Sequence, residues 1–349
     1  MTSTVRIGES VVADGQPCFV IAEAGSNHDG SLEQAFALID AAAGAKADAV
    51  KFQVFRADRL YPKSAGVSEY LELDRPIYDI VAELELPYEW LPRLVARCED
   101  RGILFLASVF DEESVDLVDP FVPAFKVASY EMTQIPLLRH VASKGKPVIV
   151  STGTANLGEV RASVDAFRAT GNDDLVLLQC TAAYPAPIES LNIRAIATLK
   201  EAFELPVGLS DHSRDPVVAP VTAVAVGANM LEKHFTLDNA LPGPDHRFAV
   251  EPQELRTLVA QVRAAEAALG SGEKIADPVE EELRRFARRS IFAARDICAG
   301  EPFTSENVTI LRNGSLVAGL EPVRLDDVLR RRAARDLAAE TAVREDDLV

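Results

Sequence analysis

The sequence predicts a (β/α)8 barrel, or TIM barrel, followed by a small C-terminal α/β module. Three observations support this prediction. Short apolar runs without alternation recur along the chain, as in strands that are covered on both faces. Amphipathic helical stretches lie between these runs, which favours a parallel sheet. Many runs end at a residue suited to chemistry, and reactive side chains at the carboxyl ends of strands are typical of barrel active sites.

Eight apolar runs are the predicted strands: Phe19–Ala22, Ala49–Val50, Ile103–Leu106, Ala124–Phe125, Val148–Val150, Val176–Cys180, Val207–Leu209 and Met230–Lys233. The predicted helices are amphipathic stretches: Leu32–Gly44, Leu91–Arg101, Ile135–Ser143, Leu157–Thr170, Ile193–Phe203, Pro216–Val226 and Pro252–Leu269. This alternation through eight units favours a closed barrel over an open doubly wound sheet. The second connection, from Arg56 to about Pro87, is unusually long, and its segment Tyr61–Gly66 is expected to form a loop over the barrel mouth.

The character of the chain changes after Leu269, where the turn-rich segment Gly270–Glu273 begins. Short strand-like and helical pieces follow, at Ile291–Ala293, Val308–Leu311 and around Leu325–Arg331. We expect a catalytic barrel over residues 1–275, a linker over 276–287 and a separate module over 288–349. So short a module buries little core by itself, so we expect it to dock on a neighbour.

The chain of 349 residues is acidic, with 36 basic against 54 acidic side chains and a formal charge of -18. Such a surface repels phosphate backbones, so neither nucleic acid nor an anionic membrane is an expected partner. No apolar run approaches the roughly 20 residues that cross a bilayer, and the first residues lack a signal-peptide plan, so a cytoplasmic protein is expected. The four cysteines form no CxxC pair, which argues against disulfides and structural zinc and predicts reduced core cysteines.

The first candidate for chemistry lies where the strand Phe19–Ala22 breaks into the Gly-rich polar segment Glu23–Gly30. A carboxylate at a barrel mouth, such as Glu23, is suited to act as a base or to position a water. The alternative is a structural carboxylate that pairs with a lysine at a neighbouring strand end.

The second candidate is a pair of histidines, His212 and His234, which close the seventh and eighth predicted strands. These strands are neighbours in a closed barrel, so the two imidazoles are expected near one point. Two imidazoles make half of a divalent-metal site, which waters or substrate oxygens would complete. The alternative is that both are satisfied core histidines, because His is also a common polar anchor at strand ends.

The third candidate is a set of lysines and hydroxyls at strand ends: Lys51, Lys126, Ser129, Ser151, Thr152 and Ser210. Their convergence would suit a phosphate or a compound with both carboxylate and phosphate. Either lysine could instead be snorkelling or ion-paired. No GxxxxGK[ST] loop is present, which argues against nucleotide hydrolysis. The three candidates together suggest metal-assisted carbon–carbon bond chemistry on a phosphorylated small molecule.

Short motifs in the chain resemble one family throughout: AEAGSNHDG, VKFQ, FKVAS, STG, QCTAAYPAP, GLSDHS, EKHFT and PGPDH. They resemble the sialic acid synthases, which condense phosphoenolpyruvate with an N-acetylmannosamine-type aldose to make nonulosonic acids. The tail, with Arg288–Ile291, Arg295–Ile297 and Arg335-Asp336, resembles the antifreeze-protein-like SAF domain that ends these enzymes. The resemblance implies a C–C bond-forming transferase with a SAF domain at 288–349.

The resemblance also implies a role for every candidate residue except Thr152. His212 and His234 would bind Mn2+, or alternatively Mg2+ or Co2+, and Glu23 would lie near the reacting carbons. Phosphoenolpyruvate would be held by Lys51, Lys126, Ser129, Ser151 and Ser210. The sugar would be contacted by Gln53, Tyr184 and Asp245. Arg312 would reach into the active site of the partner subunit, which implies a homodimer with swapped SAF domains.

In the implied reaction the metal polarises the open-chain aldehyde for attack by the enol carbon of phosphoenolpyruvate. Water, activated by the metal or oriented by Glu23, then adds to the resulting cation, and phosphate leaves with C–O cleavage. Three departures from the family pattern concern the pocket. Ala182 stands where some bacterial members have asparagine, Arg312-Asn313-Gly314 lacks the usual Pro-Gly, and bulky Arg247-Phe248 follow Asp245 and His246.

Other functions stay open at this point. Within the synthase class the product could be N-acetylneuraminate, legionaminate, pseudaminate, a deaminated analogue or the adduct of another aldehyde. A metal-dependent barrel lyase or isomerase acting on a sugar phosphate is a second reading, and it needs no second substrate. A non-catalytic binding protein is a third, against which the presence of Glu23, both lysines and both histidines argues.

Overall fold

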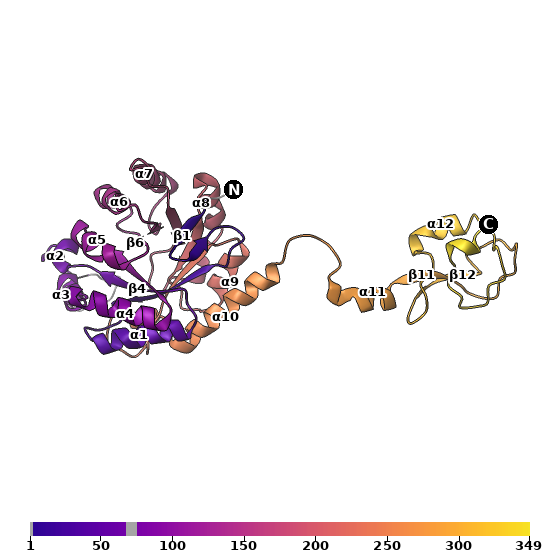
Figure 1. The fold of residues 1–349 in the computed structure, drawn as a ribbon, viewed down its shortest axis with the longest axis horizontal. Coiled ribbons are helices and arrows are strands. Elements are labelled where there is room, and N and C mark those ends of the chain that lie inside the picture. The colour runs from indigo at the N-terminus through magenta and orange to yellow at the C-terminus, as the bar shows by residue number, and fades with distance from the viewer. Residues whose placement is uncertain (1–2, 68–74) are drawn as a thin grey trace. The chain divides into compact units, whose positions relative to one another are not determined.

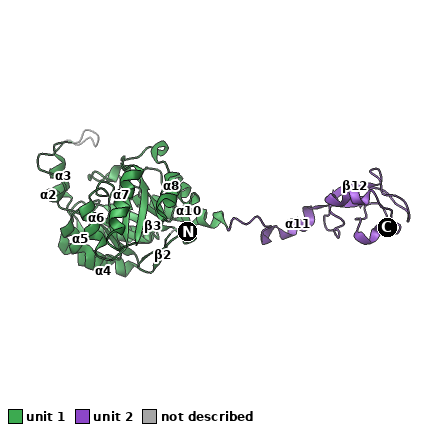
Figure 2. Cartoon of the chain, turned by 90° about the horizontal axis from the view of Figure 1, so that it is seen from above, with its two compact units in different colours: residues 1–270 green, residues 271–349 purple. Residues whose placement is uncertain are grey.

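The computed structural model describes residues 3–67 and 75–349. Residues 68–74 of the long second connection, and Met1 and Thr2 of the segment considered as a signal peptide, lie outside the described part. The chain divides into two compact units, residues 1–270 and 271–349, which Figure 2 colours separately.

The first unit is the predicted (β/α)8 barrel (Figure 1). Its parallel strands close in the order β10-β3-β4-β5-β6-β7-β8-β9. Their bounds are β3 Phe19–Gly25, β4 Ala49–Val54, β5 Leu104–Val109, β6 Phe125–Val127, β7 Val148–Ser151, β8 Leu175–Cys180, β9 Val207–Asp211 and β10 Met230–His234. Each predicted apolar run overlaps one of these strands, and only Ile103 and Ala124 precede the strand they were assigned to, so the prediction of the barrel is confirmed.

The helices around the strands are α1 Leu32–Gly44, α2 Ala57–Leu60, α3 Ile77–Glu83, α4 Leu91–Arg101, α5 Glu112–Val118, α6 Ile135–Ala142, α7 Leu157–Arg168, α8 Ala195–Phe203, α9 Val218–Ala225 and α10 Pro252–Leu269. The predicted bounds of α1, α4 and α10 are correct to the residue because these helices carry clear end signals. Ser31 caps α1, Gly102 ends α4 at a φ of 67°, and Pro252 opens α10.

Three helices of the barrel unit were not predicted. α2 and α3 lie within the long second connection, and residues 61–67 between them have no regular structure. The third, α5, has seven residues, too few for a periodic pattern to stand out. Its start is nevertheless marked by a capping box, in which Asp111 accepts from the Ser114 backbone N–H and the Ser114 side chain contacts the Asp111 backbone.

An antiparallel hairpin at the start of the chain, β1 Val5–Ile7 and β2 Ser10–Val12, was also not predicted. Val5, Ile7 and Val12 are fully buried against the residues that point into the barrel near the start of its strands. Burying each such side chain stabilises the fold by about 1.5–3 kcal/mol. The hairpin closes one end of the barrel, so only the carboxyl ends of the strands remain for a site.

The second unit contains η5 Pro278–Glu280, α11 Glu281–Ala287, β11 Arg289–Ala293, β12 Val308–Arg312 and α12 Leu325–Val328. The two strands pair antiparallel, with Arg289 opposite Arg312. This unit has a small core of its own, which includes Ile291, Phe303 and Val343. Segment 276–287, expected as a linker, contains η5 and α11.

All four cysteines are free. Cys18, Cys98 and Cys180 are buried, but the prediction of a core position is wrong for Cys298, which is exposed in an irregular segment after β11. No helix in the described ranges is long and apolar enough to cross a membrane.

Candidate active site

The alternation of side chains along the strands explains which polar residues face the barrel axis. In β4, Val50, Phe52 and Val54 pack outward against helices while Ala49 lies in the inner core, so Lys51 and Gln53 point inward. The same argument turns the following residues inward at the other strand ends: Glu23, Lys126, Ser151, Cys180, Ser210, His212, Glu232 and His234. The barrel therefore gathers most of the predicted site residues at one end.

Two lysines and two carboxylates form a buried charged cluster there. Lys51 Nζ lies 2.6 Å from Glu23 Oε2 and 3.8 Å from Glu232 Oε1, and Lys126 Nζ lies 3.6 Å from that same Glu232 oxygen. Lys51 also donates to Ser108 Oγ at 2.6 Å. Glu23 and both lysines are thus ion-paired, as the alternative readings of these residues expected. Two positive and two negative charges balance before any substrate is bound.

Burial shifts the titration of this cluster. It raises the pKa of Glu23 above its ordinary value, against the opposing effect of Lys51. It would also raise the pKa of Glu232, but Lys126 and Lys51 outweigh it and hold that pKa below its ordinary value. For Lys126, burial lowers the pKa.

The predicted anion-binding hydroxyls differ in what they already bond. The Ser129 hydroxyl accepts from the Gly153 N–H at 2.9 Å, and the Ser210 hydroxyl donates to Glu232 Oε1 at 3.4 Å. The Thr152 hydroxyl donates to the Leu178 carbonyl at 3.0 Å, which is a structural bond. Ser151 Oγ is buried, and the described residues offer it no hydrogen-bond partner. A buried hydroxyl in this state is suited to receive a ligand.

The rings of His212 and His234 lie 5.4 Å apart, centroid to centroid, at the ends of the paired strands β9 and β10. His212 Nδ1 donates to the Thr181 carbonyl at 3.0 Å, which leaves its Nε2 for a ligand. Tyr184 stacks on His212 at 4.3 Å. His234 Nδ1 is buried with no hydrogen-bond partner in the described ranges, and Asp245 Oδ2 is 3.8 Å away.

This pair suits a divalent metal. A carbonyl bond to one ring nitrogen is the usual support of a metal-bound imidazole, and an orphaned buried nitrogen is a polar atom that a metal would satisfy. Burial, followed by the nearby His212 and lysines, lowers the pKa of His234 well below its ordinary value. Burial also acts to lower the pKa of His212, but Cys180 reverses this and raises it. No group of three or more His, Cys, Asp and Glu side chains in residues 3–67 and 75–349 is arranged for a metal.

The residues predicted to contact the sugar lie beside the histidines. Gln53 Nε2 donates to Glu23 Oε1 at 3.0 Å. A Cβ added to Gly25, whose φ is 56°, would lie 3.4–3.5 Å from Gln53, Glu23 and Asp245, so these three groups surround one small space. Burial, with a smaller effect of Glu23, raises the pKa of Asp245 to about 6.

One of the two bulky residues that depart from the family pattern packs into this region. The buried Phe248 ring lies 5.2 Å from the His234 ring and 5.3 Å from Tyr184. Arg247 is exposed. Arg312 belongs to the second unit, where it is exposed at the end of β12.

Three further polar residues border the cluster and were not predicted. Glu232 and Ser108 contact the lysines as described, and the inward position of Glu232, two residues before His234, is the signal that could have identified it. Glu131 follows Ser129 in the loop after β6, and burial raises its pKa to about 7 against the effect of Lys126.

Comparisons with known proteins give matches to two family models, to curated relatives and to solved structures. The model of the NeuB family matches residues 38–274, and that of the SAF domain matches residues 288–349. The spore coat polysaccharide biosynthesis protein SpsE of Bacillus subtilis is 43% identical, over 99% of this chain and 97% of that protein. The N,N'-diacetyllegionaminic acid synthase of Legionella pneumophila is 42% identical over 93% of each chain. The crystal structure of the N-acetylneuraminic acid synthetase of Leptospira borgpetersenii aligns with a TM-score of 0.74 at 34% identity, over 81% of this chain and 96% of that one.

Proposed function

The chain belongs to the NeuB family, and on that premise we propose that it condenses phosphoenolpyruvate with an N-acetylmannosamine-type aldose, giving a nonulosonic acid and phosphate. Such an enzyme is a C–C bond-forming transferase. The observation that carries the proposal is the meeting of a lysine pair, an unsatisfied Ser151 hydroxyl and a histidine pair at one end of the barrel.

The phosphoenolpyruvate site is proposed at Lys51, Lys126, Ser129, Ser151 and Ser210. Both lysines are held close to one point by Glu232. Two ammonium groups and several hydroxyls in a desolvated place match a compound that carries a carboxylate and a phosphate. Glu232 already neutralises part of the positive charge of the lysines. It would therefore lower the affinity of this site for other anions.

His212 and His234 would hold the metal, for which Mn2+ is the proposed ion. When bound, it would polarise the aldehyde of the acceptor as a Lewis acid. The other roles in the reaction are proposed for side chains. Gln53 and Lys51 each hold one oxygen of Glu23, which fixes the carboxylate beside the space that Gly25 leaves open. We propose that Glu23 orients the water that adds to C2 of the former phosphoenolpyruvate, while the bond from C2 to the phosphate oxygen breaks.

A homodimer is proposed as the working unit. Along η5 and α11, Val279, Leu283 and Phe286 recur at helical spacing with exposed fractions of 82%, 66% and 54%. An exposed apolar stripe of this kind supports burial against a second copy. In this arrangement Arg312 would enter the partner subunit's site. Mixing Arg312→Ala with Glu23→Ala subunits should then restore part of the activity, and no recovery at any mixing ratio would reject the swapped arrangement.

Among acceptors, a 2,4-diacetamido hexose is the first candidate, since the legionaminic acid synthase is 42% identical over 93% of this chain. N-acetylmannosamine is the second, supported by the structural similarity to the Leptospira borgpetersenii synthetase. The half-buried ring of Tyr184 and the buried ring of Phe248, beside the histidines, favour an acceptor with apolar substituents such as acetyl methyl groups.

The test is phosphate release from phosphoenolpyruvate with Mn2+, across N-acetylmannosamine, its 6-phosphate, mannose and 2,4-diacetamido hexoses. Release that requires one aldose, with a matching product mass, is the expected result. A chelator should stop turnover and added Mn2+ should restore it. Phosphate release, or conversion of a sugar phosphate, without any second substrate would instead support the lyase or isomerase reading.

A further inference from the structure

The loop between β10 and α10, residues 235–251, carries two groups that face the histidine pair. Asp245 lies 3.8 Å from His234 Nδ1, and the Phe248 ring lies 5.2 Å from the His234 ring. Backbone pairing ties the two ends of the loop together, because Phe235 bridges Val250. The middle of the loop has only local backbone turns, such as the bond from the His246 N–H to the Gly243 carbonyl at 3.4 Å, so side-chain contacts connect it to the rest of the barrel.

These contacts include a continuous chain of four hydrogen-bonded side chains. His246 is fully buried, and its Nε2 donates to the Asp29 carboxylate at 3.0 Å and 3.1 Å. Its other ring nitrogen, Nδ1, lies 2.6 Å from the hydroxyl of Thr236. Asp29 in turn accepts from Gln34 Nε2 at 2.9 Å. The imidazole next to Asp245 is therefore held from both sides.

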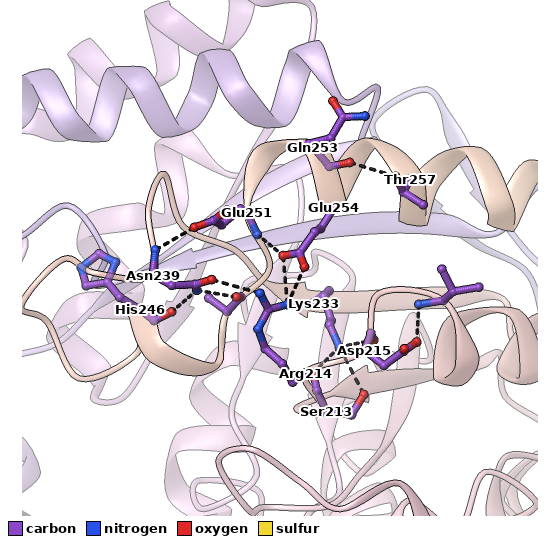
Figure 3. Close-up of polar contacts among 12 residues, drawn as sticks. Ser213, Arg214, Asp215, Lys233, Asn239, His246, Glu251, Gln253, Glu254 and Thr257 are labelled. Atoms are coloured by element: carbon purple, nitrogen blue, oxygen red, sulfur yellow. Dashed lines mark hydrogen bonds and ion pairs between the residues drawn. The ribbon is translucent and has the colours of Figure 1, made fainter.

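The backbone of the loop is fastened separately, by Asn239 (Figure 3). Its side-chain amide donates to the carbonyls of His246 at 2.5 Å and Ala249 at 2.8 Å. Its side-chain oxygen accepts from Arg214 at 3.0 Å, and Arg214 also donates to Glu254. These bonds fix the carbonyls that flank Phe248, whereas Asp29 fixes the side chain that follows Asp245.

The surroundings of Gly243 show how closely the loop 235–251 approaches Asp29, in the segment Glu23–Gly30. A Cβ at this position would lie 2.6 Å from Asp29 Oδ1 and 2.9 Å from the His246 ring. Contacts that short do not occur, so only glycine permits the bond between His246 and Asp29. Asp29 itself has a φ of 46°, a left-handed conformation that non-glycine residues rarely adopt.

We propose that Asp29 and His246 are positioning residues that hold Asp245 and Phe248 against His234, and so shape the acceptor end of the site. The assignment of that end to the aldose rests on the proposed function. Phosphoenolpyruvate would bind at Lys51 and Lys126. None of the bonds that hold the loop 235–251 in place involves either lysine. Loss of the Asp29–His246 bond should therefore weaken the aldose and spare phosphoenolpyruvate.

Three variants separate this role from a general structural one. Asp29→Ala removes the acceptor, and His246→Asn retains a group near Thr236 but is too short to reach Asp29. His246→Gln returns a donor close to the position of Nε2. With the aldose that wild type accepts, the first two should raise the KM for the aldose about 10–100-fold, an effect of the size found when the hydrogen-bond partner of a metal-binding side chain is lost. Their KM for phosphoenolpyruvate should change by less than about 3-fold, and His246→Gln should recover most of the loss.

A matched control exists on the helices around the barrel, where His140 Nε2 lies 2.7 Å from Asp116 Oδ1 in a solvent-exposed pair. His140→Asn breaks the same kind of contact and should leave both KM values unchanged. Equal rises in both KM values in Asp29→Ala and His246→Asn, or no rise in either, would overturn the proposal.

Hydrogen exchange of the free protein tests the positioning without any turnover. In Asp29→Ala and His246→Asn, peptides from residues 236–250 should exchange at least about 10-fold faster, while those of the other barrel loops keep their wild-type rates. Unchanged exchange in this segment rejects the positioning role. If no aldose in the panel supports turnover, the proposed function fails by itself, and this measurement still decides the role of the pair.

Discussion

Glu23 and Lys51 lie directly opposite each other on the neighbouring strands β3 and β4, with 2.6 Å between Oε2 and Nζ and only 2% of each side chain exposed. A buried pair of this kind costs desolvation of both charges, so it is weak evidence that the contact exists for stability. The pair lies at the carboxyl ends of the strands, where barrel active sites are found, so a catalytic role explains it better than a stabilising one.

Removal of one partner, compared with removal of both, should therefore separate the effect on stability from the effect on activity. Lys51→Met leaves Glu23 and Glu232 buried with less compensation and should cost about 3–5 kcal/mol of unfolding free energy. The double variant Glu23→Gln, Lys51→Met removes both charges and should regain most of that stability. Both variants should lose activity by at least about 100-fold. Urea unfolding followed by the fluorescence of Trp90, the one tryptophan, measures the first quantity for the barrel. A double variant with near-normal turnover would show that the pair is structural.

The histidine pair predicts a metal affinity that depends equally on two residues. His212→Ala and His234→Ala should each weaken Mn2+ binding by at least about 100-fold, because these two imidazoles are the proposed protein ligands of the ion. Titration calorimetry of the free protein with Mn2+ measures this without substrate. His140→Ala, on the outer helix α6, serves as the control and should bind Mn2+ as wild type does. Unchanged affinity in either active-site variant would remove the metal site from this position.

Glu131 predicts a pH dependence of stability. Burial raises its pKa from 4.5 to about 7, so between these values the folded state keeps a proton that the unfolded chain has released. Stability from this group is present below pH 4.5 and is lost as pH rises toward 7. The change amounts to about 3 kcal/mol. Glu131→Gln should abolish it, so that the difference in unfolding free energy between pH 5 and pH 8 shrinks. Glu99→Gln, at an exposed position of α4, should leave that difference unchanged.

Much of the fold was predictable because barrel strands are covered on both faces and appear as plain apolar runs. The inward direction of Lys51 or His234 follows from counting alternate residues from those runs. The features that were not predicted are either very short elements or contacts between residues far apart in the sequence. Three-residue strands such as Val5–Ile7 carry no periodicity of their own.

The parts of the site that were missed depend on long-range contacts. Asp29 and His246 are 217 residues apart, and only closure of β10 against β3 brings their loops together. Glu232 was missed for another reason. It lies inside an apolar run, and its role becomes apparent only from its contacts with Lys51 and Lys126 of other strands.

The narrow interior of the barrel gives a last prediction, at Gly208 of β9. This residue points inward, where an added Cβ would collide with the backbone carbonyl oxygen of Met230 and lie 2.8 Å from a methyl carbon of Leu178. The carbonyl belongs to the adjacent strand β10 and cannot move without breaking the barrel. Gly208→Ala should therefore cost more than about 4 kcal/mol.

Gly44, at the end of α1, is the matched control, because nothing lies within 4 Å of its added Cβ. Gly44→Ala should stabilise the protein by about 0.5–1 kcal/mol, since alanine loses less backbone entropy on folding. Urea unfolding monitored through Trp90 compares the two, and circular dichroism reports whether Gly208→Ala folds at all. Equal stabilities of Gly208→Ala and wild type would mean that β9 and β10 can separate at this level, which would also loosen the spacing of His212 and His234 just beyond it.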